Sequence, residues 1–299
     1  MTASRKFNAL LKSFERRRPM RAGSLIVTIY GDAIVPRGGS LWLGSLLDMV
    51  AGFGIESGQV RTATSRLVAD GWFERTRIGK NSYYCLSAKG AAEFAAATAR
   101  IYRAGDPPWS GEIDVAIIAP IQTAQRAAIR DRMLRAGYGQ AAANVMVRPH
   151  IPATSDEPVE KPREIVRMRA RLDDAQDARS LAQACWQLAD LDAGYRQFLG
   201  VFAPVADELA DGVSLTDAQA FQLRILLIHD WRRIVLRDPL LPRAMLPDDW
   251  HGTPARALVS SVYRQIVARS ERWLDKNALN ETGGVPPSNP SLAQRFFPS

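Results

Sequence analysis

The chain has 299 residues, of which 46% are hydrophobic and 23% are charged, and this composition excludes a disordered or fibrous protein. No run reaches the roughly 18 apolar residues of a membrane-spanning helix, and the basic N-terminus lacks the apolar stretch of a secretory signal. The two cysteines, Cys85 and Cys185, form no CxxC pair, and there are only three histidines. We therefore expect a cytoplasmic protein of two or three domains without a disulfide framework, a structural metal site or a cofactor.

The net charge of +8 is distributed unevenly along the chain. Residues 1–105 hold 16 basic and 7 acidic side chains, which gives +9, whereas the rest of the chain holds 23 basic and 24 acidic ones, which gives −1. An excess of positive charge confined to one part of a chain indicates a surface for nucleic acid or an acidic membrane in that part.

The first third of the chain predicts a winged helix-turn-helix. A basic arm is expected at 1–22, and helices are expected at 24–35, 40–54 and 57–72, where Ser40 is a suitable N-cap and Gly54 a stop signal. The stretches WFERTR and SYYCLS then flank IGKN (78–81) as two strands of a hairpin. With a further helix at 88–105, these elements define a DNA-binding domain over residues 23–105.

The helix at 57–72 has an apolar side that repeats at helical spacing, formed by Val60, Ala63, Thr64 and Leu67. The opposite side is polar, and together with the hairpin tip it supplies the candidate DNA-binding residues: Gln59, Arg61, Thr62, Ser65, Arg66, Arg77, Lys80 and Asn81. Arg reads guanine and Gln reads adenine in the major groove, and Ser or Thr binds bases or phosphates. The alternative is a solvated amphipathic helix without a partner.

Within the candidates we expect a division of roles. Gln59, Arg61 and Thr62 are near the start of the helix and are expected to reach base edges, whereas Arg66 is better placed for phosphate. The hairpin tip is expected to contact the flanking backbone or the minor groove. Basic residues of the arm are expected to add affinity that does not depend on base sequence: Arg5, Lys6, Lys12, Arg16, Arg17, Arg18 and Arg21.

A Pro/Gly-rich boundary near residue 106 precedes a second pattern, which predicts a ferredoxin-like α+β domain over 106–190. Strands are expected from EIDVAIIAP, AAANVMVRP and EIVRMRARL, with a helix before the second strand and another at 173–191. The polar, Pro-rich segment 148–162 is expected to be an exposed loop. Asp173, Asp174 and Asp177 are expected to cap the second helix.

The remaining chain has a helical pattern and predicts a C-terminal all-α domain over 191–279. Its 238–254 segment, rich in proline, is expected to be a long ordered connection, and a flexible tail is expected at 280–299. The predicted fold class is therefore a multidomain α+β protein.

Several stretches of the sequence resemble the PaaX family of repressors of phenylacetate catabolism genes. The stretch VRTATSRLVADGWFERTRIGKNSYYCLSAKG resembles the winged helix of that family. Colinear matches follow at ARIY, WSG, LIHDWRRIVLRDPLLPRAMLPDDWHGTPAR and SSVYRQI, although Glu112 and Ile113 stand where an aromatic residue commonly follows WSG. The resemblance implies a homodimer that binds double-stranded operator DNA and releases it on binding phenylacetyl-CoA or a related acyl-CoA. It also implies that the central domain resembles the Cas2 fold.

A candidate effector site lies in the C-terminal part of the sequence. Arg232 falls within the apolar stripe of its helix, beside His229, and a buried cation needs an anionic partner. A phosphate of CoA is one such partner, and Asp230 or Asp238 of the protein is another. The candidate effector-binding residues are His229, Arg232, Arg233, Arg243 and Trp250. Trp250 and Tyr195 are equally consistent with ordinary core aromatics, and an unrelated metabolite remains possible as the inducer.

No set of residues typical of an enzyme is evident. His229-Asp230 is an isolated pair, Asp114 is poorly placed for a metal site, and no Gly-rich phosphate loop, GxSxG or HExxH is present. We therefore expect a regulator and not an enzyme, with no catalytic residues. The alternative is a Cas2-like nuclease or CoA-ester hydrolase that its winged helix tethers to DNA.

Overall fold

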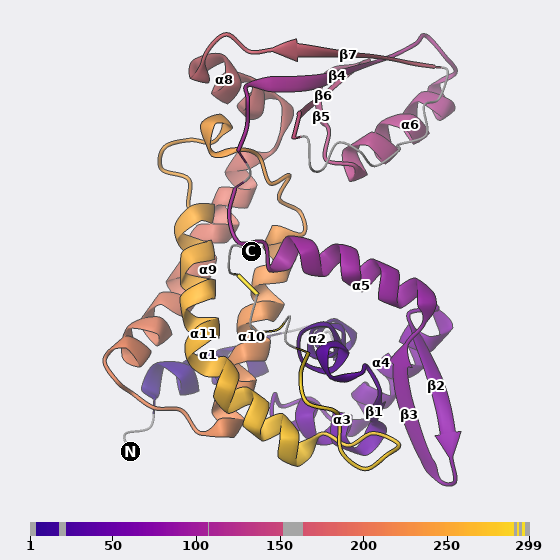
Figure 1. Cartoon of the computed structure of the whole chain (residues 1–299), viewed down its shortest axis with the longest axis vertical. Helices are drawn as coiled ribbons and strands as arrows, with labels where there is room; N and C mark the ends of the chain where they lie inside the picture. The colour runs from indigo at the N-terminus through magenta and orange to yellow at the C-terminus, as the bar shows by residue number, and fades with distance from the viewer. Residues whose placement is uncertain are drawn as a thin grey trace. The chain divides into compact units, whose positions relative to one another are not determined.

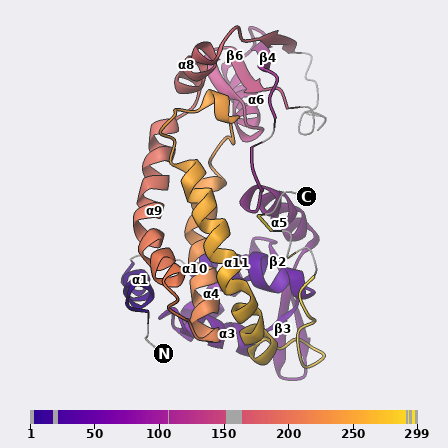
Figure 2. The same ribbon diagram turned by 60° about the vertical axis from the view of Figure 1, so that its left-hand side comes forward.

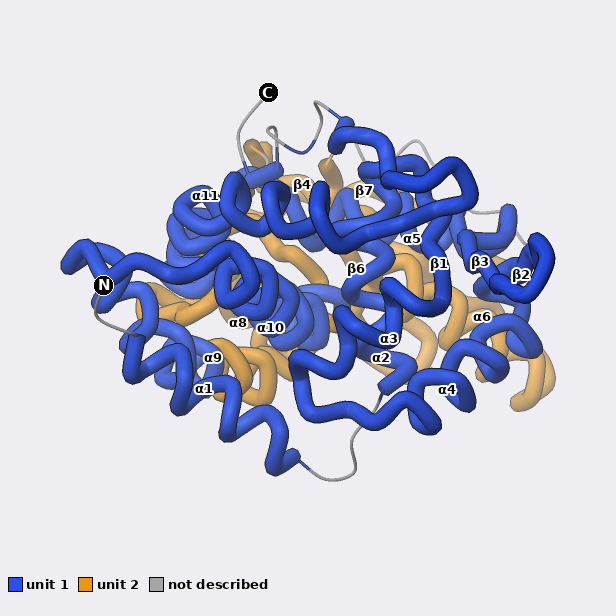
Figure 3. Tube along the Cα trace, turned by 90° about the horizontal axis from the view of Figure 1, so that it is seen from below, with its two compact units in different colours: residues 1–104, 196–236, 253–299 blue, residues 105–195, 237–252 orange. Residues whose placement is uncertain are grey.

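The chain is a mixed protein of many helices and two small antiparallel sheets (Figure 1). The computed structural model describes residues 4–17, 22–106, 108–151, 164–289, 292, 295 and 296. Two compact units divide it (Figure 3): unit 1 comprises 1–104, 196–236 and 253–299, and unit 2 comprises 105–195 and 237–252. The α+β class predicted from the sequence is confirmed.

Unit 1 contains the helices and hairpin expected in the first third of the chain. In chain order the elements are α2 (Ala22–Ile29), a π-helical turn (Tyr30–Ile34), a 3₁₀ turn (Val35–Arg37), β1 (Leu41–Trp42), α3 (Leu43–Ala51), α4 (Ser57–Ala69), β2 (Phe73–Ile78), β3 (Asn81–Leu86) and α5 (Ala88–Ile101). β3 is the central strand of the sheet β1-β3-β2. Gly79 at the hairpin tip has a φ of +59°, a conformation that residues with a Cβ rarely adopt.

The start of α3 differs from the prediction. Leu41 and Trp42 pair with Tyr84 and Tyr83 of β3, and the helix begins only at Leu43. Ser40 is therefore not the N-cap, and its hydroxyl donates to Glu281 instead. The pairing of this short strand depends on a partner more than 40 residues away, which helical spacing alone does not indicate.

Within the basic arm expected at 1–22, the described residues include a helix that docks on unit 1. α1 (Arg5–Glu15) buries Phe7, Leu10 and Phe14, whose spacing of three and four residues places them on one face. Arg17 then forms a two-bond ion pair with Asp230. Arg18 and Arg21 lie outside the described residues.

The expected helical C-terminal domain is not separate from the first third of the chain. Its helices are α9 (Leu188–Ala210), α10 (Asp217–Val235) and α11 (Gly252–Asn277), and α10 packs on α2 and α5 within unit 1. α10 buries side chains on most of its circumference, including Trp231, so it needs neighbours on several sides. α10 and α11 run side by side in both views (Figures 1 and 2), with Phe221 stacked on Trp273.

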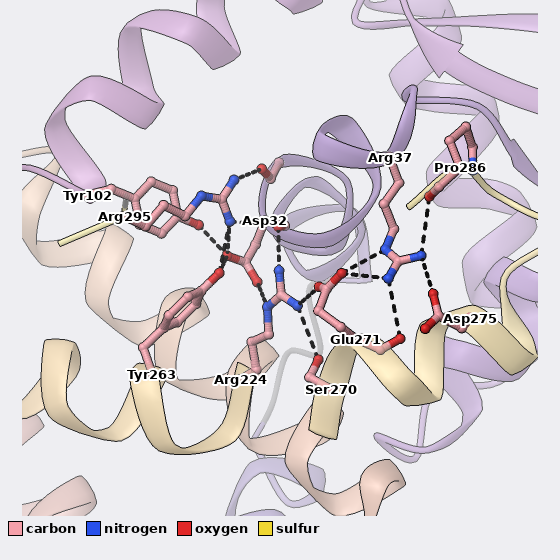
Figure 4. A network of polar contacts seen from close by, with 11 residues as sticks. Asp32, Arg37, Tyr102, Arg224, Tyr263, Ser270, Glu271, Asp275, Pro286 and Arg295 are labelled. Carbon is pink, nitrogen blue, oxygen red and sulfur yellow. Dashed lines mark hydrogen bonds and ion pairs between the residues drawn. The ribbon is translucent and has the colours of Figure 1, made fainter. Parts of the chain in front are cut away.

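A buried network of charged side chains joins these segments (Figure 4). The carboxylate of Asp32, in the π-helical turn, accepts bonds from Arg224 of α10 and from Arg295. Arg224 also pairs with Glu271 of α11, which in turn pairs with Arg37. Asp32 and Arg224 are fully buried, which is tolerable for charges only because each is paired and hydrogen-bonded.

The described residues near the end of the expected flexible tail pack against the rest of unit 1. Leu292 and Phe296 are buried, and Arg295 belongs to the network around Asp32. The backbone NH of Asn289 donates to the carbonyl of Pro36. These residues pack because they provide apolar side chains and a cation to a site that already holds a buried carboxylate.

Unit 2 contains one antiparallel sheet with the strand order β5-β6-β4-β7. Its elements are β4 (Glu112–Ile118), α6 (Thr123–Arg135), β5 (Gly139–Ala142), β6 (Val145–Pro149), β7 (Ile165–Arg171) and α8 (Ala175–Cys185), followed by the first residues of α9. α6 covers one face of the sheet through Ile129 and Met133, which pack on Ala116, Ile118 and Met146.

Two predicted elements of unit 2 are divided in the structure. Where a single strand was expected at 141–149, the structure has the hairpin β5–β6. The turn was not predicted because the run of alanines gives no side-chain pattern that marks one. The helix expected at 173–191 is interrupted at Trp186, which is extended, between α8 and α9. Asp174 caps α8 as predicted, by accepting from the NH of Asp177. The 238–254 connection is ordered and buries Trp250, and the loop expected at 148–162 lies mostly outside the described residues.

Candidate nucleic-acid interface

The polar face of α4 is exposed as predicted. Val60 and Thr64 are fully buried on the inner side of the helix, and Ala63 and Leu67 are half-buried. All five predicted DNA-binding residues of the helix are exposed: Gln59, Arg61, Thr62, Ser65 and Arg66. α4 lies beside the β2–β3 hairpin (Figure 1), so helix and hairpin present one continuous surface.

Two of these residues have bonds within the helix. Gln59 forms a capping box with Glu56, in which its side-chain oxygen accepts from the backbone NH of Glu56 at 3.3 Å. The hydroxyl of Thr62 donates to the carbonyl of Gly58 at 3.0 Å. Gln59 therefore stabilises the first turn of α4, which holds Arg61 in a fixed place.

A groove of about 440 Å³ lies between α4 and the hairpin. It brings together five of the predicted residues: Arg61, Ser65, Arg77, Lys80 and Asn81. A shallower depression of about 420 Å³ lies on the outer side of α4 and is lined by Arg61, Thr62, Ser65, Arg66 and Ala69. Among the described residues that line these two surfaces none is acidic, so both are positively charged.

Arg75 also lines the groove, and the sequence analysis missed it. Its guanidinium donates twice to the hydroxyl of Ser82 on the neighbouring strand, at 3.1 and 2.9 Å. Arg75 and Arg77 are two residues apart on β2, and side chains at that spacing lie on the same face of a strand. Alternation along the strand is therefore the signal that would have identified Arg75, because the prediction considered only the hairpin tip.

The basic residues in and after α1 fall into two groups, one exposed and one bound to α10. Arg5, Lys6, Lys12 and Arg16 are exposed, whereas Arg17 is bound to Asp230. The ion pair and the hydrogen bond between Arg17 and Asp230 raise the pKa of the guanidinium. Arg17 therefore holds α1 to α10, and its guanidinium is bound to Asp230 although 34% of the side chain is exposed.

The candidate effector residues lie in two groups that belong to different units. His229, Arg232 and Arg233 are on α10 in unit 1, whereas Arg243 and Trp250 are in the 237–252 connection of unit 2. The sequence treats them as one site because they are close along the chain. The structure does not bring the five together within either unit.

In unit 1, two of these residues bind α2. Nδ1 of His229 lies 3.1 Å from the hydroxyl of Thr28, and burial lowers the pKa of the imidazole to about 4. Arg232 donates to the hydroxyls of Thr28 and Ser24 at 2.8 and 2.7 Å, and burial lowers the pKa of its guanidinium to about 10. Arg233 is exposed.

In unit 2, Arg243 is exposed and donates to the carbonyl oxygens of Pro247 and Asp248, at 2.6 and 2.9 Å. Trp250 is buried and its ring packs edge-on against Tyr195. The hydroxyl of Tyr195 donates to Asp238, one of the two aspartates expected as a partner for Arg232. Asp230, the other, pairs with Arg17, so Arg232 is held by hydroxyl groups and not by either expected carboxylate.

Asp114, considered above for a metal-dependent alternative, lies beside two guanidinium groups. Arg148 lies 3.1 Å and Arg169 lies 3.6 Å from its carboxylate, and Nδ1 of His150 lies 3.1 Å away. The two arginines neutralise the carboxylate charge that would attract a metal ion. In the described part of the chain, no cluster of three or more His, Cys, Asp or Glu side chains is arranged to hold a metal.

Comparison with known proteins gives evidence on the family of this chain. Residues 21–90 match the family model described as PaaX-like protein, and residues 186–276 match the model described as PaaX-like protein C-terminal domain, together more than half of the chain. The Transcriptional repressor PaaX of Escherichia coli (strain K12) is 32% identical over 292 residues, which cover 93% of this chain and 90% of that protein.

The family matches place this protein in a class of transcriptional repressors. The chain belongs to the PaaX family, and the resemblance seen in the sequence is confirmed.

A solved structure shares the fold. The uncharacterized protein Rv0674 from Mycobacterium tuberculosis has a TM-score of 0.50 and 24% sequence identity, over 76% of this chain and 90% of that chain. No helix among the described residues is long and apolar enough to cross a bilayer.

Proposed function

We propose that residues 22–104 form a winged helix-turn-helix that binds double-stranded operator DNA, with α4 in the major groove and the β2–β3 hairpin on the flanking backbone. The observation that carries the proposal is the groove between these elements, where Arg61, Arg75, Arg77 and Lys80 meet without an acidic neighbour among the described lining residues. Positive charge and hydrogen-bond donors on one exposed helix are what direct readout of base edges requires.

The family supports three finer proposals. The protein acts as a homodimer in the cytoplasm, releases its operator on binding phenylacetyl-CoA or a related acyl-CoA, and controls genes of phenylacetate catabolism. The strand order of unit 2, with β4 between β6 and β7, supports a ferredoxin-like, Cas2-like assignment of that unit. In a dimer the two recognition helices must lie roughly 34 Å apart to enter successive major grooves, so an effector that changes this separation releases DNA.

DNA binding is tested with fluorescence anisotropy on palindromic duplexes from the promoter regions of the neighbouring genes, in a titration of salt. Affinity is expected to fall steeply with salt, by about 10³-fold or more between 50 and 200 mM if at least six phosphates are contacted. Binding that does not depend on salt, or no binding to any duplex, would contradict the proposal.

The variants Arg61→Ala and Lys80→Ala separate base readout from backbone contact. Arg61→Ala is expected to reduce discrimination between operator and mutated operator by about 1–3 kcal/mol, because Arg61 is placed to reach a base. Lys80→Ala is expected to weaken binding to all duplexes alike. It is also expected to reduce the slope of log K against log salt concentration by about one, which is the loss of one phosphate contact. Lys276→Ala, an exposed change on α11, is the matched control. A uniform loss of affinity in both variants would show that α4 is not in the major groove as proposed.

A further inference from the structure

Arg295 and Phe296 occupy a buried site that distant parts of unit 1 form. The π-helical turn contributes Asp32, the residue after α5 contributes Tyr102, and α11 contributes Tyr263, and Figure 4 shows all three around Arg295. Only 9% of the Arg295 side chain and 6% of Phe296 are exposed. The site therefore encloses both residues although they lie far from its walls in the sequence.

The guanidinium of Arg295 has partners in its plane and on its face. Nη1 donates to the carboxylate of Asp32 at 2.8 Å and to the hydroxyl of Tyr263 at 2.9 Å. The carbonyl oxygens of Asp32 and Gly31 also accept from the group, at 2.8 and 3.3 Å. Its Cζ lies over the ring of Tyr102, 4.0 Å from the centroid. In-plane donors together with an aromatic contact on the face distinguish arginine from lysine, so the site is selective for arginine.

Phe296 fills the apolar part of the site. Its ring packs edge-on against Tyr102 and Tyr263, with centroid distances of 5.2 and 5.5 Å, and its backbone NH donates to the carbonyl of Tyr102 at 3.1 Å. The φ of Phe296 is +65°, in the left-handed region that residues with a Cβ rarely adopt. The contacts of the site therefore hold the backbone of Phe296 in a conformation that it would not favour by itself.

Asp32 keeps other partners if Arg295 leaves. Its carboxylate also accepts from Nε of Arg224 and from the hydroxyls of Tyr102 and Tyr263. A buried carboxylate is strongly destabilising where nothing compensates its charge, and Arg224 still compensates the charge of Asp32. The site is therefore compatible with an open state as well as with the occupied one.

The chain reaches this site along the elements of the helix-turn-helix. The carbonyl of Leu279 accepts from the NH of Trp42, at the start of α3, at 2.7 Å. The NH of Asn289 donates to the carbonyl of Pro36, in the 3₁₀ turn, at 2.8 Å. The segment that carries Arg295 is thus attached to the residues that precede α3 and to the turn that follows α2.

The π-helical turn also contacts the candidate DNA-binding elements. The hydroxyl of Tyr30, in the same turn as Asp32, donates to the carbonyl of Tyr84 in β3 at 3.2 Å, and its ring packs against Phe73 of β2. α2, which leads into the turn, packs on α4. The position of this turn therefore affects both α4 and the β2–β3 hairpin.

We propose that the site around Asp32, Tyr102 and Tyr263 is a peptide-binding site for an arginine followed by a phenylalanine. The chain's own Arg295 and Phe296 occupy it reversibly, and their occupancy holds α4 and the hairpin in the arrangement that binds DNA. The control of DNA binding rests on the proposed function, whereas the peptide-binding site does not.

Cleavage of the folded chain before the site tests reversible occupancy. A protease site inserted between Gly283 and Gly284, which are both exposed, allows the full chain to be cut after it has folded. A fluorescent peptide of residues 284–299 is expected to replace the cut segment and to bind saturably. The same peptide with Arg295→Ala is expected to bind about tenfold more weakly or worse, because the guanidinium contacts are lost. A peptide with Pro287→Ala, at an exposed position, is the matched control.

Fluorescence anisotropy follows the exchange of the segment. A cut chain that never exchanges its segment, or that binds the altered and the unaltered peptide equally, would overturn the peptide-binding site. Circular dichroism is recorded as the segment leaves. Loss of the helices at that step would overturn reversible occupancy, because an open state would then not exist.

Operator binding by uncut variants tests the control of DNA binding. Arg295→Ala is expected to weaken operator binding about tenfold or more and to leave the slope of log K against log salt concentration unchanged, because Arg295 acts through α4 and contacts no phosphate. Lys276→Ala, which also removes one positive charge, is the matched control. Arg295→Lys keeps the charge and loses the planar donors, so it is expected to weaken binding in the same way and serves if Arg295→Ala does not fold. Unchanged affinity, or a slope reduced by about one, would overturn this control.

Addition of the peptide to the cut chain separates the two parts of the proposal from the proposed function. The peptide of residues 284–299 is expected to restore operator affinity to a cut chain that has lost its segment, and the Arg295→Ala peptide at the same concentration is not. Peptide binding without a change in operator affinity would overturn the control of DNA binding. If the cut chain binds the peptide while the unaltered chain binds no duplex, the peptide-binding site stands and the proposed function is wrong.

Discussion

His229 is 5% exposed where α10 meets α2, and this burial has a consequence for stability. Its ring packs edge-on against Phe14 of α1, and Nδ1 contacts Thr28. Burial is the main cause that lowers the pKa of His229 from 6.5 to about 4, and Arg232, Arg233 and Arg17 lower it further, whereas Asp230 acts in the opposite direction. The native state therefore keeps the imidazole neutral at a pH at which an unfolded chain would protonate it.

We expect the free energy of unfolding to fall as pH decreases from 6.5 to 4. The unfolded chain binds a proton at His229 near pH 6.5 and the native chain only near pH 4, so protonation favours unfolding in this window. The loss attributable to His229 is about 2–3 kcal/mol at the lower end. Urea titrations at pH 7.5 and pH 5 measure it, and His229→Asn is expected to show a shallower dependence. An equal pH dependence in both chains would show that His229 does not titrate in this way.

Sequence patterns predict at this scale which residues are exposed, and they do not predict the partners. The outward side of α4 follows from the helical repeat of Val60 and Thr64, because burial depends on local periodicity. The apolar stripe of α10 predicted that Arg232 is buried. The fully buried cation of this helix is Arg224, which the stripe did not indicate. Its partner Asp32 is 192 residues away, and no local pattern encodes a contact across that distance.

The side chain of Ser87 connects the start of α5 to the turn before β2. The hydroxyl of Ser87 donates to the carbonyl of Gly71 at 2.6 Å and accepts from the NH of Gly90 at 3.0 Å, so Ser87 caps α5 and ties it to the turn before β2. The cap therefore positions the wing relative to the end of α4.

Ser87→Ala is expected to lower the free energy of unfolding by about 1–2 kcal/mol, because both bonds are lost and one NH is left without its cap. Ser13→Ala, an exposed change within α1, is the matched control and is expected to change stability by less than about 0.5 kcal/mol. Urea denaturation measures both changes. Equal effects of the two substitutions would contradict the capping role.

Elements were predictable where a periodic pattern ended at a turn signal. The helix at 57–72 and the hairpin around IGKN are found close to the expected bounds. α1 was missed because its short apolar face, Phe7, Leu10 and Phe14, is embedded in basic residues that dominate the composition. The strand Leu41–Trp42 was missed because two residues carry no periodicity, and only pairing with β3 defines it.

At the scale of the whole molecule, unit 1 is assembled from three separate segments of the chain. Trp231 of α10 donates to the carbonyl of Ile101, and Arg295 binds Asp32. The division into consecutive domains expected from the sequence fails for this reason. Boundary signals such as a Pro/Gly-rich stretch mark where the chain leaves a unit, and they do not show that it returns.

A fragment of residues 1–105 is therefore expected not to fold, although it contains every predicted winged-helix element. It lacks α10 and α11, so the apolar faces of α2 and α5 are uncovered and Asp32 has no Arg224. Circular dichroism and thermal denaturation of the fragment test this, with the full chain as the control. A cooperative thermal transition in the fragment would show that the first third is independent of α10 and α11.

The bond between Asp32 and Arg295 also sets an order of events during synthesis. The two residues are 263 positions apart, so a ribosome makes Arg295 long after Asp32 and also after Arg224, the other cation that binds Asp32. A chain whose translation stops early has the whole candidate DNA-reading helix but lacks the segments that complete its unit. Such a product is expected to hold α4 on an incomplete unit 1, because Asp32 then lacks its bond to Arg295.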